Sequence, residues 1–135
     1  MSDPLHRDVA AIEHGGQILA DMKKVTPSLV YAALLTDDGF EVVRVASLTL
    51  DGARFASMAS SMQALADAVA NELSLGVSKY IIIASPHGYV VQLRVPGHPL
   101  VLSALFDDDE TVGKALAITK SSAEKMSSFL ATVAA

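Results

Sequence analysis

The sequence has no cysteine, no tryptophan and few charged residues. Without cysteine the chain cannot form a disulfide, a thiolate metal site or a cysteine nucleophile. Charged residues make up 19% of its 135 positions, against roughly 25% in typical soluble domains. The net charge is −5, and the lysines and arginines are scattered. Because phosphate binding needs a basic surface, we expect neither a nucleic acid partner nor a polybasic membrane contact.

The chain also lacks any apolar run near the ~20 residues of a membrane span, so no membrane insertion is expected. Its first residues, Met1–Asp8, are too polar for a secretory signal peptide, which predicts a cytoplasmic protein. Yet hydrophobic residues make up 51% of this one-domain chain, and its mean hydropathy is +0.40. This surplus fits either a partner-binding surface, most simply for a second copy, or an unusually complete core.

The sequence carries no nucleophile elbow, P-loop, dinucleotide fingerprint or paired-histidine zinc motif. His87 and His98 fall in expected turns, where solvated side chains are commoner than metal ligands. The acidic run Asp107–Glu110 lacks the spacing of a calcium loop and suits the start of a helix. Arg54 fits the rim of a binding surface better than an arginine finger. We therefore expect no enzyme, and no catalytic, cofactor-binding or metal-binding residues.

Clusters of turn residues divide the chain into five expected strands. They are Leu29–Thr36, Phe40–Val45, Ser78–Ser85, Tyr89–Val95 and Leu100–Phe106. Short connections predict antiparallel pairing within the first pair and among the last three. The first and third strands are apolar on both faces and need cover on both sides. Charged residues in the second strand are typical of a sheet edge.

Helical spacing of apolar residues predicts three helices. They lie within Pro4–Val25, at about Ala53–Leu75 and at about Glu110–Ala131. Glycine costs about 1 kcal/mol inside a helix, so we expect a break at Gly15–Gly16 and a firm helix from Gln17. Asp107 and Glu110, three residues apart, suit a cap at the start of the last helix.

The middle helix is the most informative segment. A large apolar stripe, within about 60° either side of Met62, is expected to cover the sheet. Its members are Phe55, Met58, Met62, Leu65, Val69 and Leu73. One flank of this stripe consists of alanines, whose small side chains would let a second helix approach closely. These are Ala56, Ala59, Ala66 and Ala70. The opposite face carries one formal charge, at Asp67, and either contacts another protein or is an exposed helix rich in alanine and serine.

Several segments match a known family pattern in type and order. They are Ala33–Phe40, Phe55–Met62, Leu73–Gly76, Ile81–Val91, Leu100–Phe106 and Val112–Ala115. Together with the order helix, hairpin, helix, three-stranded meander, helix, they resemble the roadblock/dynein light chain superfamily, which includes bacterial regulators of Ras-like GTPases. The resemblance covers roughly Gly16 to Leu130.

The resemblance implies an α/β (α+β), roadblock/profilin-like fold. Its five-stranded antiparallel sheet has the first and last helices on one face and the central helix on the other. Residues 16–135 would form one roadblock domain, and residues 1–15 a variable N-terminal arm or helix. Family members dimerise by pairing their third strands and bringing their central helices together. The implied function is a non-enzymatic homodimer that binds and regulates or scaffolds a small Ras-like GTPase, with no cofactor.

The same resemblance places the dimer and partner interface on the central helix and third strand. The expected interface residues are Ala56, Ala59, Ser60, Gln63, Ala66, Asp67, Ala70, Lys79, Tyr80, Ile81, Ile82 and Ile83. The alternative is a small-molecule-sensing domain with a pocket between sheet and helix. Tyr31, Gln92 and Ser103 would be its polar groups, because they are polar residues within expected strands.

Overall fold

The structure is a computed structural model that describes residues 4–46, 49 and 51–134. Its helices and strands follow the expected order, and a short 3₁₀ helix that was not expected precedes α1. They are η1 (Leu5–Arg7), α1 (Val9–Val25), β1 (Leu29–Thr36), β2 (Glu41–Ala46), α2 (Gly52–Glu72), β3 (Ile81–Ser85), β4 (Gly88–Arg94), β5 (Leu100–Asp107) and α3 (Val112–Ala134). Within the described residues, no helix combines the length and the apolarity that crossing a membrane requires.

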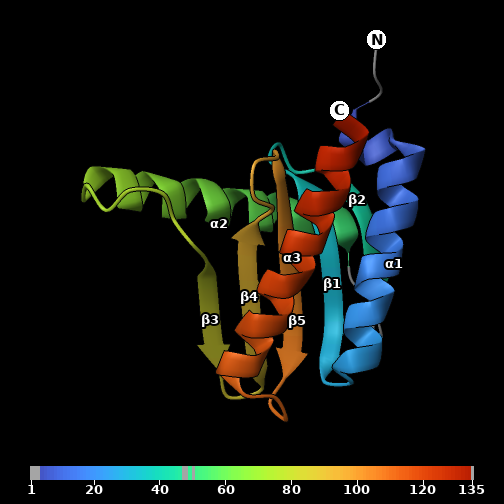
Figure 1. Cartoon of the computed structure of the whole chain (residues 1–135). Coiled ribbons are helices and arrows are strands. Elements are labelled where there is room, and N and C mark those ends of the chain that lie inside the picture. The colour runs from blue at the N-terminus through green and yellow to red at the C-terminus, as the bar shows by residue number, and fades with distance from the viewer. Residues whose placement is uncertain (1–3, 47–48, 50, 135) are drawn as a thin grey trace.

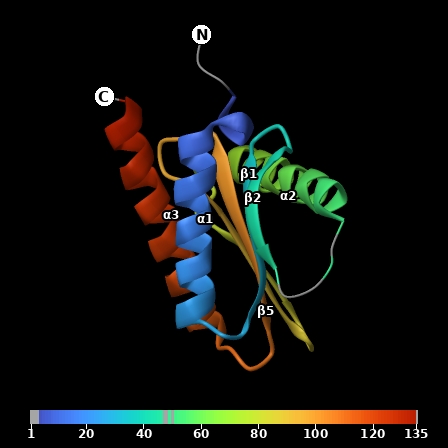
Figure 2. The same ribbon diagram turned by 90° about the vertical axis from the view of Figure 1, so that its right-hand side faces the viewer.

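The strands form one antiparallel sheet in the order β2-β1-β5-β4-β3, which leaves β2 and β3 at its edges. The edge position of β2 was predicted from its charged residues. Helices α1 and α3 lie against one face of the sheet, and α2 crosses the other face (Figures 1 and 2). The fold class expected from the sequence is therefore confirmed.

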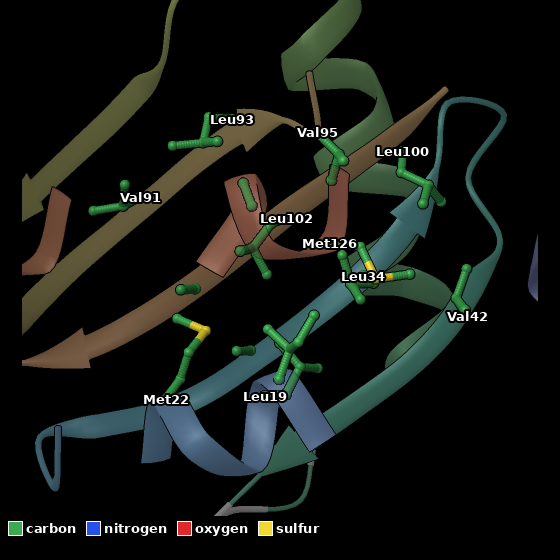
Figure 3. Packing of buried hydrophobic residues seen from close by; sticks show 14 of the residues in the cluster. Leu19, Met22, Leu34, Val42, Val91, Leu93, Val95, Leu100, Leu102 and Met126 are labelled. Atoms are coloured by element: carbon green, nitrogen blue, oxygen red, sulfur yellow. The ribbon is translucent and has the colours of Figure 1, made fainter. Parts of the chain in front are cut away.

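The main core lies between the sheet and the pair α1 and α3. Leu19 and Met22 of α1 point toward β1 and β5 (Figure 3). Met126 of α3 lies beside Leu34 of β1 in the same cluster. Because successive strand residues alternate between faces, Tyr31, Ala33 and Leu35 face α2 instead. Strand β1 is thus covered on both sides, as its apolar sequence predicted.

Helix α1 is continuous, so the expected break at Gly15–Gly16 is wrong. The reason lies in the packing of Gly15. A Cβ added there would lie 2.8 Å from Leu34 Cδ1 and 3.2 Å from Val43 Cγ1. Glycine therefore lets α1 approach β1 and β2 closely, and the burial gained offsets its poor helix propensity.

The start of α3 also differs from expectation. The helix begins at Val112, and the Thr111 hydroxyl accepts a hydrogen bond from Lys114 N–H at 3.2 Å. Glu110 instead accepts a hydrogen bond from the Ser28 hydroxyl at 2.8 Å, which lowers the pKa of this glutamate. Asp107 accepts one from Asp109 N–H at 2.9 Å and so closes the turn. Thr111 therefore caps α3, whereas Glu110 links the start of the helix to Ser28, the residue before β1.

Candidate functional site

The first half of α2 seats on the sheet through small side chains. Ala56 and Ala59 are buried against Tyr31, Ala33 and Leu35 of β1 in a cluster separate from the main core. Phe55 at the edge of this cluster meets the Tyr31 ring at a centroid distance of 4.8 Å. Small residues let the helix backbone lie close to the strands, so this contact involves few residues and buries little side-chain surface.

Most of the large apolar stripe of α2 does not cover the sheet, so that expectation is largely wrong. Phe55 packs against Tyr31 and Met62 is half-buried, but Met58, Leu65, Val69 and Leu73 are exposed, and Leu65 retains 66% of its surface. The residues that contact the sheet are instead the smaller Ala56 and Ala59, together with Gln63 beside Gln92 of β4. Helix α2 crosses the strands, and its C-terminal part extends beyond β3 (Figure 1). Much of the stripe therefore has no sheet beneath it.

Polar contacts hold α2 where its apolar contact ends. Gln92 of β4 is wholly buried and donates a hydrogen bond to the Ala59 carbonyl oxygen at 2.8 Å. Arg94 of the same strand lies 3.1 Å from the Asp67 carboxylate of α2 and 3.5 Å from that of Asp37 in the β1–β2 turn. These contacts fix α2 relative to β4 without burying its large apolar side chains.

A second polar cluster supports the first turn of α2. The Tyr31 hydroxyl donates a hydrogen bond to Glu41 Oε1 at 3.2 Å, and Glu41 pairs with Arg44 at 3.3 Å. Burial, reinforced by the negative Glu41, raises the pKa of Tyr31 to about 12. Gly52 packs against this pair, because a Cβ there would lie 2.8 Å from the Arg44 guanidinium. Asp51 caps the helix by accepting from Arg54 N–H.

Strand β3 presents an open edge. It pairs with β4 on one side, and it is the last strand of the sheet on the other. The segment from Tyr80 to Ser85 carries no charged residue. Charged or covered edges normally prevent sheets from pairing with other chains. An uncharged edge with an exposed Ile83 is thus suited to pairing with another strand.

The exposed stripe of α2 and the open edge of β3 are joined by the exposed side chains of the α2–β3 connection. We call the combined surface the apolar belt. It consists of Met58, Leu65, Val69, Leu73, Leu75, Val77 and Ile83. The helix ends at Glu72, and Ser74, with φ 55°, takes the left-handed position that follows it, while Gly76, with φ +89°, turns the chain toward β3. An exposed apolar surface that spans three consecutive segments indicates an interaction site.

The residues expected at the interface differ in their accessibility. Four are buried within the chain: Ala56, Ala59, Gln63 and Ala70. Five are half-buried: Ser60, Ala66, Asp67, Ile81 and Ile82. Three are exposed: Lys79, Tyr80 and Ile83. The alanine flank of α2 is thus largely used within the chain, because small side chains are what the shallow seat on β1 requires.

Sequence reasoning missed the exposed residues of α2 and its connection to β3. Met58, Leu65, Val69 and Leu73 were assigned to the sheet, and Leu75 and Val77 to no site. One available signal was the line of small residues at helical spacing, which marks the face that approaches a strand most closely. Another was the run Leu73–Val77, where large apolar residues lie beside an expected turn.

The polar groups of the alternative sensor hypothesis do not line an open pocket. Tyr31, Gln92 and Ser103 are each wholly buried between α2 and the sheet. Gln92 is held by the α2 backbone, and Tyr31 by Glu41. A ligand could reach them only if α2 moved away from the sheet.

The acids before α3 form a cluster of three carboxylates, from Asp107, Asp108 and Asp109, within 4.8 Å of one another. Within the described part of the chain this is the sole group of three acidic or histidine side chains with that spacing. Its Asp107 carboxylate already accepts a backbone hydrogen bond, as expected of turn acids.

No family model and no curated protein matches the sequence significantly. Solved structures do match it. Myxococcus xanthus MglB is 12% identical, with a TM-score of 0.82 over 90% of each chain. The gliding protein MglB from Thermus thermophilus is 17% identical, with a TM-score of 0.77 over 94% of this chain and 91% of that one. A Roadblock/LC7 domain from Streptomyces avermitilis is 12% identical, with a TM-score of 0.77 over 85% and 96%.

This chain has the roadblock fold. The match extends over nearly the whole chain, so the roadblock fold includes α1 and α3 as well as the sheet. At such low identities the comparison establishes the architecture alone, and the chemistry of the site must come from the chain's own surface. Within the roadblock fold, the apolar belt lies on α2, on the α2–β3 connection and at the β3 edge.

Proposed function

We propose that this protein is a non-enzymatic homodimer whose apolar belt joins the two copies, and that the dimer binds and regulates or scaffolds a small Ras-like GTPase. The observation that carries the first part is the belt itself. Its side chains are exposed in one copy, while the chain has a well-filled core of its own. Burial of such surface is the main driving force of protein association.

The geometry of the belt favours a second copy as the occupant. Pairing of two β3 edges would extend the sheet across both copies and satisfy backbone groups that the single chain leaves to solvent. The same pairing would bring the projecting ends of the two α2 helices toward one another. A two-fold interface of this kind needs one self-complementary surface, and an uncharged apolar belt meets that requirement.

Leu65→Asp tests the dimer, with Val9→Asp as its matched control. Both side chains are 66% exposed, but Leu65 lies in the belt and Val9 lies on α1. Light scattering at 1–100 µM should give twice the 14.1 kDa chain mass for the wild type and for Val9→Asp. Leu65→Asp should give the single-chain mass, because a buried unpaired carboxylate is costly. A monomeric wild type would refute the dimer.

The proposed docking face for a GTPase is the side of α2 that the belt leaves open. Its side chains, among them Ser57, Ser61 and Ala64, are small, exposed and uncharged. They lie about a third of a turn from the belt, so they stay accessible when the belt is buried. The identity of the partner comes from the resemblance to the roadblock superfamily, whose bacterial members include regulators of Ras-like GTPases.

Ala64→Arg tests this docking face, and Ala117→Arg on α3 is its control, since both alanines are exposed. The immobilised wild-type protein should retain a small GTPase from lysate of its source in a manner that depends on added GDP or a non-hydrolysable GTP analogue. Ala64→Arg should lose this retention, and Ala117→Arg should keep it. A dimer that retains no GTPase in either nucleotide state would contradict the GTPase assignment while leaving the dimer intact.

A further inference from the structure

A small hollow lies on the face of the sheet that α1 and α3 cover, between α3 and the residues just before β3. Its volume is about 200 Å³, and its walls come from three segments. The apolar lining residues are Tyr80, Leu93, Pro96 and Ala123. Helix α3 crosses β4 and β5 and leaves the start of β3 uncovered on this face (Figure 1). The hollow is therefore lined entirely by residues of one copy.

The hollow is too small for a typical metabolite. Pockets that enclose small molecules usually measure about 300–1,000 Å³. About 200 Å³ instead suits one large apolar side chain inserted from a partner. Interfaces commonly use such a single anchor, an aromatic or leucine side chain held in a preformed pocket.

The charges around the hollow define the chemistry of the segment that carries this anchor. Lys79 and Lys120 line it, and neither forms an ion pair within the described residues. Arg94 also lines it but is already paired with Asp67 and Asp37. Of the residues that the structure describes, Glu124 is the only acidic one that lines the hollow. The surroundings are thus net positive on a chain whose net charge is −5.

We propose that this hollow binds an acidic peptide segment of a partner protein, with one aromatic or leucine side chain inserted between Tyr80 and Ala123 and acidic neighbours beside Lys79 and Lys120. The apolar walls supply the binding energy, and the lysines select the charge of the flanking residues. Because α2 lies on the opposite face of the sheet, such a segment does not compete with a protein bound to α2.

The probe is a fluorescein-labelled dodecapeptide with a central phenylalanine between runs of glutamate, titrated with the full-length protein at low ionic strength. Fluorescence anisotropy should show saturable binding. Replacing the phenylalanine of the peptide by alanine should weaken binding about tenfold, because an apolar anchor is lost. Replacing the glutamates of the peptide by lysines should abolish binding, and added salt should lower the affinity for the acidic peptide.

The substitution Lys120→Glu should lower the affinity of the protein for the acidic peptide about fivefold. Lys125→Glu is the matched control and should leave that affinity unchanged. Both lysines are exposed on α3, but only Lys120 lines the hollow. Amide chemical shifts on peptide addition should change at Leu93 and Ala123. Three outcomes would each overturn the proposal: equal weakening by both variants, equal binding of the alanine peptide, or shift changes confined to α2.

Discussion

Gly15 and Gly16 allow a test in which the same substitution has opposite effects at neighbouring positions. Both lie inside α1, where alanine is more favourable than glycine by about 1 kcal/mol. A Cβ at Gly16 would meet Val43 Cγ2 at an ordinary contact distance of 3.5 Å. Gly16→Ala should therefore raise the free energy of unfolding by about 1 kcal/mol.

Gly15→Ala brings the same helical gain and a steric cost. Its Cβ would lie 2.8 Å from Leu34 Cδ1, and Leu34 is wholly buried. The leucine can move only by displacing other core residues, and overpacking of this kind costs about 1–3 kcal/mol. The net change in unfolding free energy should therefore lie between about zero and a loss of 2 kcal/mol.

Urea unfolding followed by circular dichroism measures both variants. Protein concentration must be held fixed, because self-association adds to the apparent stability. The two variants should differ by about 1–3 kcal/mol, with Gly16→Ala the more stable. Equal stabilisation would refute the close approach of α1 to β1. Destabilisation by both would show that the helix is interrupted at the glycine pair, as its sequence alone suggests.

Three local contacts give further predictions, each measured by chemical denaturation. Gly88→Ala should lower the unfolding free energy by about 2–3 kcal/mol, because its Cβ would collide with the Phe106 carbonyl oxygen. Since the pKa of Tyr31 is raised to about 12, stability should fall from pH 10 to pH 12 as the unfolded chain ionises first, and Tyr31→Phe should remove that part of the fall. Because the pKa of Glu110 is lowered in the folded chain, its ionised form stabilises the fold above its ordinary pKa of 4.5, and this stabilisation is lost on acidification. Ser28→Ala should therefore lower the unfolding free energy at neutral pH, and the difference from the wild type should shrink below pH 4.5.

Much of the sheet could be predicted because its signals are local. The turn at Asp37–Gly39 requires a positive φ, and Gly39 adopts +90° there. Short connections then force neighbouring strands to pair, which gives the β1–β2 hairpin and the β3–β4–β5 meander. Charges on β2 predicted its edge position, and the structure places it there. The expectation that the third strand is covered on both sides is wrong, because β3 is the other edge and much of it is exposed.

The misassigned helix ends and the missed continuity of α1 have a different origin. Whether Gly15 breaks a helix depends on Leu34 and Val43, which are distant in sequence and occupy the space that a side chain would need. Glu110 likewise accepts a hydrogen bond from Ser28, which is distant in sequence, besides its contacts with Thr111 and Lys114. Local propensities favour a structure by about 1 kcal/mol per residue, so a single tertiary contact can reverse them.

The misassigned face of α2 shows what hydrophobic periodicity can and cannot establish. Leu65 and Val69 recur at the spacing of a buried helix face, and the pattern correctly indicates a surface that needs cover. It does not say which chain supplies the cover. Here the sheet contacts α2 through alanines and glutamine, since close approach favours small side chains, and the large side chains remain outside. Because the chain leaves most of this apolar stripe uncovered, we propose a second molecule as its cover, and this proposal would also account for the surplus of apolar residues in the sequence.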